Sequence, residues 1–329
     1  EFTDVSSNIV YVKVSNPNYT DRFGSNSVVI TPRTIVLTAN SDSKTYDGTP
    51  LTNSGHTIST GAFVTGEGLA TVTVVGAQTY VGSSANTITG HILEVGTKAM
   101  NYNISYLPGT LTVTAADIDI TVTANSKTEE YNGSQLTDSG WVLTNGSLID
   151  GDVLQVTVVG SITNVGTEDN EITLVKVMNG TEDVTANYNI TEVDGLLTVT
   201  KKAVMITAAS ESFTYDGTSK SNSNFTVTGL VGSDDLDAVV SGSIKYPSES
   251  PVVNKVMSHS FVVGLAGNYN VSYTDGALTM NTAAIAITVT ADDNSKVYDG
   301  TPLTDSGWTL TSGTLISGDV LQVTVVGSI

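Results

Sequence analysis

The stretch KVYDGTPLTDSGW, residues 296 to 308, has close copies elsewhere in this 329-residue chain. The copies are marked by their tyrosines, which are Tyr46 in YDGTPLTNSG, Tyr131 in YNGSQLTDSG, Tyr215 in YDGTSKSNSN and Tyr298 in YDGTPLTDSG. The intervals between successive tyrosines are 85, 84 and 83 residues. A repeat of this length is long enough to form a small domain, whereas the shorter repeats of solenoids are not.

A second marker follows the same period. The tripeptide Asn-Tyr-Asn occurs at 101–103, 187–189 and 268–270, and a looser copy lies within NPNYT at 16–20. Between the two markers, the run GDVLQVTVVGSI occurs at 151–162 and again, without change, at 318–329. The chain is therefore built from one repeated unit, of which three whole copies and two halves are present.

The residues between the markers predict β-strands. In IDITVTA at 118–124 apolar residues alternate with Asp and Thr, and AIAITVTA at 284–291 repeats the pattern, as expected for strands with one buried face. The apolar positions are Ile118, Ile120, Val122, Ile285, Ile287 and Val289. Asp-Gly and Asn-Gly pairs, which favour tight turns, separate such runs. We predict an all-β fold, a tandem array of immunoglobulin-like β-sandwich repeats of about 84 residues that forms an elongated rod.

The markers also predict the domain boundaries. The segments are the second half of a repeat at 1–33, whole repeats at 34–116, 117–200 and 201–282, and the first half of a repeat at 283–329. Thr3-Asp4-Val5 matches Thr163-Asn164-Val165, so residues 1–33 correspond to the second half of a repeat. Connections between repeats are short and contain no Gly/Ser-rich spacer, so we expect neighbouring repeats to touch and the array to be semi-rigid.

Two explanations of the half repeats stay open at this point. One is that the chain is part of a longer array of repeats that has been cut at the same point of the repeat at both ends. The other is that residues 283–329 of one molecule are completed by residues 1–33 of another. Such a head-to-tail contact between copies does not close on itself and generates a filament.

The repeated phrase suggests a structural corner in each repeat. Tyr supplies a ring to pack and a hydroxyl to bond, and the following Asp-Gly or Asn-Gly supplies a turn with positive φ. Leucines four or five residues later are expected to cover this turn, namely Leu51, Leu136 and Leu303. The position after Ser-Gly is expected to cap the core or the contact with a neighbouring repeat, and it carries His56, Trp141, Trp308 and, in the divergent third repeat, Phe225.

Composition and residue spacing argue against several functions. The net charge of −20 disfavours nucleic-acid binding, because few cations are available to neutralise phosphates. The chain has no Cys, no apolar run of membrane-spanning length and only the scattered His56, His91 and His259. We therefore expect a protein that is not an enzyme, with no catalytic, cofactor-binding or metal-binding residues and no membrane-spanning segment.

Three modifications of this expectation stay open. Calcium, the one cofactor considered, would use carboxylates among Asp150, Asp152, Asp234, Asp235, Asp237, Asp292 and Asp293. Eight Asn-x-Ser/Thr sites occur, including Asn18, Asn103, Asn189 and Asn270. Lys–Asn isopeptide bonds, if formed, would begin from Lys44, Lys127 or Lys296.

The order K-x-YDGTPLT-x-SG, GD-x-L, NYN-I/V, LTVT and I-x-ITVTA resembles the YDG/MBG-type tandem repeats of bacterial fibrillar surface adhesins. The resemblance covers essentially the whole chain, although Lys220 and the run DDLDAVV depart from it in the third repeat. It implies an extracellular protein associated with the cell surface or cell wall, which acts as the stalk of an adhesin or as a filament subunit. The alternative is a module that binds mucin or another host or surface glycan.

Overall fold

The computed structural model describes residues 1–327, which form an all-β protein whose helices in this range are four 3-10 turns of three residues each. The chain contacts divide it into two compact units. Unit 1 comprises Glu1–Asn125, Asp138–Val159 and Asn170–Gly195, and unit 2 comprises Ser126–Thr137, Gly160–Asp169 and Leu196–Ile329. The division therefore falls inside the segment 117–200, and each unit is described by itself.

Unit 1 contains most of the strands from the first half of the chain. They are β1 (Ser6–Asn16), β2 (Tyr19–Ile30), β3 (Arg33–Ala39), β4 (Asp42–Thr45), β5 (His56–Thr60), β6 (Leu69–Val75), β7 (Gly82–Leu93), β8 (Tyr102–Leu107), β9 (Gly109–Thr114), β10 (Ile118–Ala124), β12 (Trp141–Asn145), β13 (Asp152–Val159), β15 (Glu182–Asp183) and β16 (Tyr188–Val193), with η1 (Ala99–Asn101) and η2 (Thr185–Asn187). Most of β14 (Gly166–Asn179) also belongs to it.

Unit 2 contains the remaining elements. They are β11 (Lys127–Glu130), β17 (Gly195–Thr200, with Gly195 in unit 1), β18 (Lys202–Ala208), β19 (Glu211–Thr214), β20 (Phe225–Thr228), β21 (Asp235–Ser241), β22 (Val252–Val263), β23 (Tyr269–Thr274), β24 (Gly276–Asn281), β25 (Thr288–Ala291) and β26 (Trp308–Ser312), with η3 (Pro247–Glu249) and η4 (Ala266–Asn268).

One three-stranded sheet recurs with the period of the sequence. Its strand orders are β5-β3-β8 and β12-β10-β16 in unit 1, and β20-β18-β23 in unit 2. The central strand pairs antiparallel with one neighbour and parallel with the other. Each parallel ladder begins at the tyrosine of the Asn-Tyr-Asn marker, at Tyr102, Tyr188 and Tyr269. The marker therefore fixes the register of this sheet.

A second sheet lies against the first, and the core is between them. In unit 1 this sheet has the order β4-β9-β7-β6, and in unit 2 the equivalent order is β19-β24-β22-β21. Ile35 and Leu37 of β3 share one buried cluster with Ile88 of β7. Ile206 of β18 likewise shares a cluster with Leu236 of β21. The alternation of apolar and polar residues thus produces two layers with apolar faces turned inward.

The predicted alternation at 118–124 is confirmed, because Ile120 and Val122 are fully buried in β10. The matching stretch at 284–291 differs: only Thr288–Ala291 forms a strand, β25, and Ile285 is exposed. β25 pairs with β26 alone within the described residues, whereas β3, β10 and β18 each have a second, parallel neighbour. The missing ladder explains why the strand is short.

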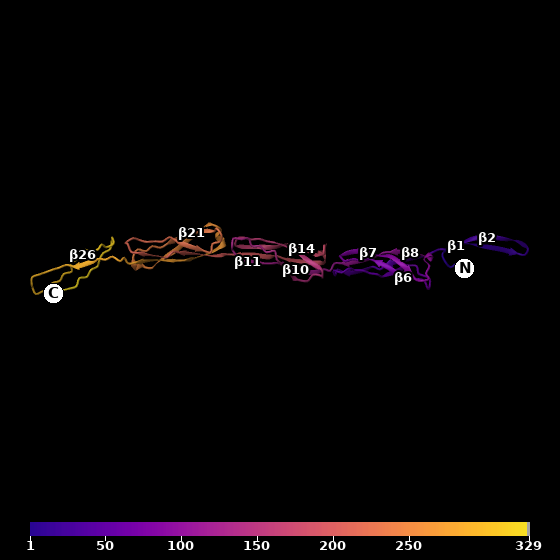
Figure 1. The fold of residues 1–329 in the computed structure, drawn as a ribbon, viewed down its shortest axis with the longest axis horizontal. Coiled ribbons are helices and arrows are strands. Elements are labelled where there is room, and N and C mark those ends of the chain that lie inside the picture. The colour runs from indigo at the N-terminus through magenta and orange to yellow at the C-terminus, as the bar shows by residue number, and fades with distance from the viewer. Residues whose placement is uncertain (328–329) are drawn as a thin grey trace. The chain divides into compact units, whose positions relative to one another are not determined.

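The segment at 6–30 is a long antiparallel hairpin of β1 and β2, drawn in indigo in Figure 1. Its apolar side chains point to both faces and are exposed, among them Ile9, Tyr11, Val14, Tyr19 and Phe23. The hairpin therefore contributes little to the buried core of unit 1.

Buried asparagines in the second layer hold neighbouring loops in place. In β7 the Nδ2 group of Asn86 donates to the carbonyl oxygens of Asn40 and Asn53, both at 2.8 Å. Asn254 of β22 makes the same two bonds to the equivalent loop, and Asn170 of β14 makes one of them. A Cβ atom on Gly76 would lie 2.7 Å from Asn86 Oδ1, so glycine is needed beside this side chain.

We predict that Asn86→Ala destabilises unit 1 by about 1–3 kcal/mol, because two partly buried carbonyl groups lose their donor. Denaturant unfolding of the full chain should show a lower midpoint for the least stable transition. The matched control is Asn103→Ala, which removes an exposed asparagine from β8 and should change stability by less than about 0.5 kcal/mol. Equal effects of the two substitutions would contradict the role assigned to Asn86.

Candidate functional site

A tyrosine, a carboxylate and an aliphatic residue form a compact group at one end of each repeat. In the second repeat the Tyr188 hydroxyl donates to Asp152 Oδ2 at 2.6 Å and accepts from the backbone N–H of Ile149 at 3.0 Å. Tyr188 opens β16 and Asp152 opens β13, so two different sheets position the group. We call this group the receiving site.

The receiving site is built in the same way three times. The first repeat uses Tyr102, Glu67 and Val64, the second uses Tyr188, Asp152 and Ile149, and the third uses Tyr269, Asp234 and Val231. The fourth copy of the acidic residue is Asp319, whose backbone N–H donates to the carbonyl of Ile316 as its equivalents do to theirs.

The repeated phrase forms a tight turn stabilised by its own side chains. Asp47 Oδ1 accepts the backbone N–H of Thr49 at 2.9 Å and the Lys44 ammonium at 2.6 Å, and Gly48 has a φ of 79°. The same side-chain-to-backbone bond closes the other three turns. We call residues 46–49, 131–134, 215–218 and 298–301 the YDG turns.

Three YDG turns pack on the carboxylate of the following repeat. The Tyr46 hydroxyl donates to Asp152 Oδ1 at 2.8 Å, and Tyr46 is 2% exposed. The equivalent bonds join Tyr131 to Asp234 at 3.5 Å and Tyr215 to Asp319 at 2.5 Å. The first bond lies inside unit 1 and the other two lie inside unit 2. The partner of each of these three tyrosine hydroxyls is therefore a carboxylate that lies 103 to 106 residues further along the chain.

The glycine of the YDG turn is needed for two reasons. Its positive φ is strained for other residues. In addition, a Cβ on Gly48 would lie 3.2 Å from Ile149 Cγ2, and one on Gly217 would lie 2.7 Å from Ile316 Cγ2. The backbone of the turn thus lies directly against the aliphatic residue of the receiving repeat.

The first asparagine of the Asn-Tyr-Asn marker makes a second link to the preceding repeat. Asn268 Oδ1 accepts the backbone N–H of Val165 at 2.9 Å, and Asn101 Oδ1 accepts that of Val5 at the same distance. Asn187 contacts the N–H of Ala116 at 3.3 Å. The sequence match between residues 3–5 and 163–165 is therefore also a match in hydrogen bonding.

Apolar side chains surround these polar contacts. Tyr46, Leu51, Leu111 and Val113 share one buried cluster with Ile120, Val177 and Tyr188. In unit 2, Tyr131 and Leu136 are clustered with Tyr269, and the two tyrosine rings meet edge to face at a centroid distance of 5.5 Å. Leu51 and Leu136 are buried beside their turns, as the sequence predicted.

Burial and the shared Asp152 carboxylate raise the pKa of two tyrosines in unit 1. Burial, followed by the hydrogen bond to Asp152, raises the pKa of Tyr188 to about 12. The same two causes raise the pKa of Tyr46 well above its ordinary value. Both hydroxyls therefore stay protonated at neutral pH and act as hydrogen-bond donors to one carboxylate.

The same shifts recur in unit 2. Burial, followed by the hydrogen bond to Asp234, raises the pKa of Tyr269 to about 12. For Tyr215 the hydrogen bond to Asp319 is the larger cause, and its pKa also rises to about 12. The Tyr215 bond joins two repeats, whereas the Tyr269 bond lies within the third repeat.

The acidic residues weighed as calcium ligands have different positions. Asp152 and Asp234 serve as tyrosine acceptors, whereas Asp150, Asp235, Asp237, Asp292 and Asp293 are exposed. Among residues 1–327 no group of three or more His, Asp or Glu side chains is arranged to hold a metal ion. The role of these acids as receiving sites was missed from the sequence. The sequence does contain a signal for this role, because an acidic residue recurs 35 or 36 residues before each marker tyrosine.

The other singled-out residues are placed as follows. Trp141 and Phe225, which follow the Ser-Gly position, pack against core clusters. Lys44 and Lys296 bind the Asp of their own YDG turns, and Lys127 binds Glu129. His91 and His259 contact the hydroxyls of Tyr106 and Tyr273. The asparagines Asn18, Asn103, Asn189 and Asn270 are exposed.

Neither the known protein-family models nor the curated proteins contain a match to this chain. In the described part of the structure, no helix has the length and apolar character needed to span a bilayer.

We predict that Tyr46→Phe lowers the stability of the contact around Asp152 by about 1.5–3 kcal/mol, because a buried carboxylate loses one donor. Thermal or denaturant unfolding of the full chain measures this change. Tyr11→Phe is the control, since Tyr11 in β1 is 75% exposed. The prediction fails if both substitutions leave the unfolding transitions unchanged.

The stability of these contacts should fall as the pH rises from about 10 towards 12. In an unfolded chain tyrosine ionises near pH 10, whereas Tyr188 keeps its proton until about pH 12, so alkaline pH favours unfolding. Denaturation midpoints measured between pH 8 and 12 test this, and Tyr188→Phe should reduce the slope. A slope that is the same with and without Tyr188 would contradict the assignment.

Proposed function

We propose that this chain is a non-enzymatic, extracellular structural protein, a semi-rigid stalk of a surface adhesin or a subunit of a surface filament. Its repeats are immunoglobulin-like β-sandwiches in a tandem array. The main support is the use of the repeated phrase: in three of its four copies, the YDG turn packs on the next repeat along the chain. A motif repeated in order to bind an outside ligand would be left accessible in each copy.

The contacts within each unit favour stiffness. The contacts at Asp152 and Asp234 each combine a tyrosine–carboxylate bond, an asparagine bond to the backbone and an apolar cluster, so bending there would break several interactions at once. The peptide between neighbouring repeats is too short for a flexible spacer: β17 ends at Thr200 and β18 begins at Lys202. A stalk requires this property, because it must hold a head away from the surface.

The acidic charge suits this role. A net charge of −20 keeps long arrays soluble and apart from one another. The resemblance of the repeated motifs to fibrillar surface adhesins supports the cell-surface location. Tyrosines with raised pKa donate to carboxylates at these contacts, Tyr46 from the preceding repeat and Tyr188 and Tyr269 from the same repeat, and this supports a structural use of the groups.

Glycan binding is the second candidate, and one observation favours it. His91 with Tyr106, and His259 with Tyr273, form partly exposed aromatic pairs at equivalent positions of the first and third repeats. Aromatic rings on a strand surface are suited to stacking on sugars. The second repeat has Val175 and Glu192 at these positions, so the platform is not a constant feature of the array.

Small-angle scattering of the full chain tests the stalk proposal. A compact protein of this length would have a radius of gyration of about 20 Å. Four β-sandwiches of roughly 40 Å each, placed end to end, would give a rod of roughly 150 Å and a radius of gyration of about 40 Å. A value near that of the compact protein would refute the proposal.

A further inference from the structure

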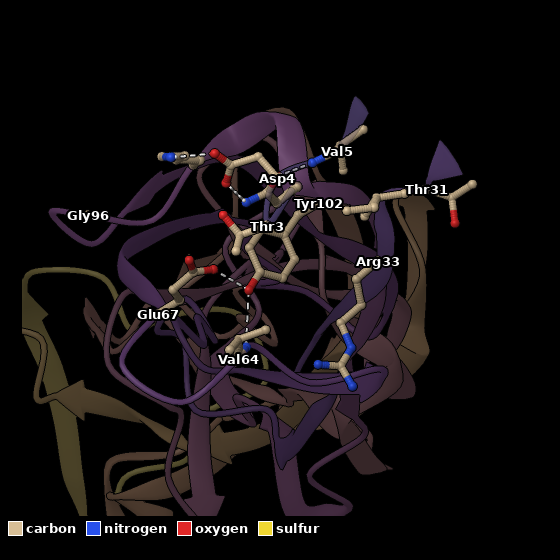
Figure 2. Close-up of a pocket in the computed structure, with 12 residues that line it drawn as sticks. Thr3, Asp4, Val5, Thr31, Arg33, Val64, Glu67, Gly96 and Tyr102 are labelled. Carbon is tan, nitrogen blue, oxygen red and sulfur yellow. Dashed lines mark hydrogen bonds and ion pairs between the residues drawn. The ribbon is translucent and has the colours of Figure 1, made fainter. Parts of the chain in front are cut away.

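The receiving site of the first repeat opens as a cavity of about 510 Å³. Figure 2 shows the Tyr102 hydroxyl directed at Glu67 and Val64, with Arg33 on another side of the ring. The two hydrogen bonds of the Tyr102 hydroxyl, to Glu67 Oε2 and from the Val64 N–H, are those found in the other receiving sites. The site is therefore fully formed before anything enters it.

Only one of the two carboxylate oxygens of Glu67 accepts a hydrogen bond from the described residues. In the second repeat each oxygen of Asp152 binds a different tyrosine, Tyr188 on Oδ2 and Tyr46 on Oδ1. In the first repeat Glu67 Oε2 binds Tyr102, and Oε1 accepts no hydrogen bond from residues 1–327. Val64, the counterpart of Ile149, is 52% exposed. The positions that a YDG turn covers in the second repeat are thus accessible here.

The rim of the cavity already has the arrangement of an occupied junction. Asp4 and Val5 line it and are held by Asn101, through bonds of 2.9 Å to the Asp4 carboxylate and from the Val5 N–H. In unit 2, Asn268 makes the corresponding bonds to Asn164 and Val165 beside the bound Tyr131. The cavity therefore has the walls that normally surround a YDG turn.

The turn at 298–301 has the complementary features. Asp299 accepts the Thr301 N–H at 3.0 Å and Lys296 at 2.9 Å, and Gly300 has a φ of 76°, within a few degrees of Gly48. Tyr298 is 93% exposed, and a Cβ on Gly300 would meet no atom within 4 Å. The turn is thus folded for docking but covers no receiving site within the described residues.

We propose that the cavity around Glu67 and Tyr102 binds the YDG turn at 298–301 of a second copy of this chain. The Tyr298 hydroxyl donates to Glu67 Oε1, its ring packs beside Tyr102, and Gly300 lies against Val64. This inference rests on the proposed structural function and adds its partner and contact residues. The contact joins two different surfaces, so it continues from copy to copy instead of closing into a dimer.

Charge predicts how the contact responds to salt. Each copy carries a net charge of −20, so copies repel one another at low ionic strength. The docking bond itself uses a neutral tyrosine hydroxyl and is weakly screened. Association should therefore strengthen as salt is raised, which is opposite to the response of a contact held by exposed ion pairs.

Sedimentation velocity of the full chain over a wide concentration range tests the proposal. The wild-type chain should form dimers and longer species as its concentration rises. Tyr298→Phe and Glu67→Gln should each weaken association at least about tenfold, because each removes or weakens one bond to a charged group. Tyr106→Phe, which changes a tyrosine on the surface of the same unit, is the matched control and should associate like wild type.

A mixing experiment identifies the surfaces involved. A Tyr298→Ala chain keeps the cavity and a Glu67→Gln chain keeps the turn, so a mixture of the two should form one-to-one complexes that grow no further. A wild-type chain that stays monomeric at all concentrations overturns the proposal. So does association that is equally strong in the Tyr298→Phe and Glu67→Gln chains, because another surface would then be responsible.

The same experiment separates this inference from the proposed function. The frictional ratio of the monomer reports an elongated or a compact particle independently of any association. An elongated monomer that never associates would overturn the docking of a second copy and leave the stalk proposal standing. A compact monomer would count against the stalk proposal itself.

Discussion

The hydrogen bond between a buried tyrosine hydroxyl and a carboxylate of the next repeat is the interaction on which the rest of this structure depends. Asp152 accepts Tyr46 from the preceding repeat and Tyr188 from its own, so one side chain links the internal fold of a repeat to its connection with a neighbour. A buried carboxylate is unfavourable unless donors satisfy it. Loss of the preceding repeat would therefore leave Asp152 without its donor Tyr46, although Tyr188 would still donate to it.

Local and long-range requirements coincide in the YDG turn. The Asp side chain closes the turn, the glycine supplies the positive φ and the close approach, and the tyrosine makes the distant bond. Each residue of the motif thus has a separate physical role. The divergent third repeat keeps all three of these features, although Lys220 replaces the leucine and binds Asp216 in place of the missing upstream lysine.

Much of the fold could be predicted because its determinants are local. Period-two alternation and Asp-Gly turns predicted the all-β class and the buried face of β10. The short strand β25 differed because it has no parallel neighbour within the described residues. The receiving sites could not be predicted fully, because Tyr46 and Asp152 are 106 residues apart and only the fold brings them together. The buried Asn86 was equally hidden, since nothing in the sequence separates it from exposed asparagines.

The most direct measurement is the distance distribution between two spin labels placed on either side of one contact. The chain has no native cysteine, so Thr89→Cys in β7 and Thr173→Cys in β14, both exposed and both in unit 1, can be labelled selectively. A narrow distribution that broadens when Tyr46→Phe is added is the predicted result. A distribution that is broad from the start, or one that Tyr46→Phe leaves unchanged, would show that the tyrosine–carboxylate bond does not hold neighbouring repeats in place.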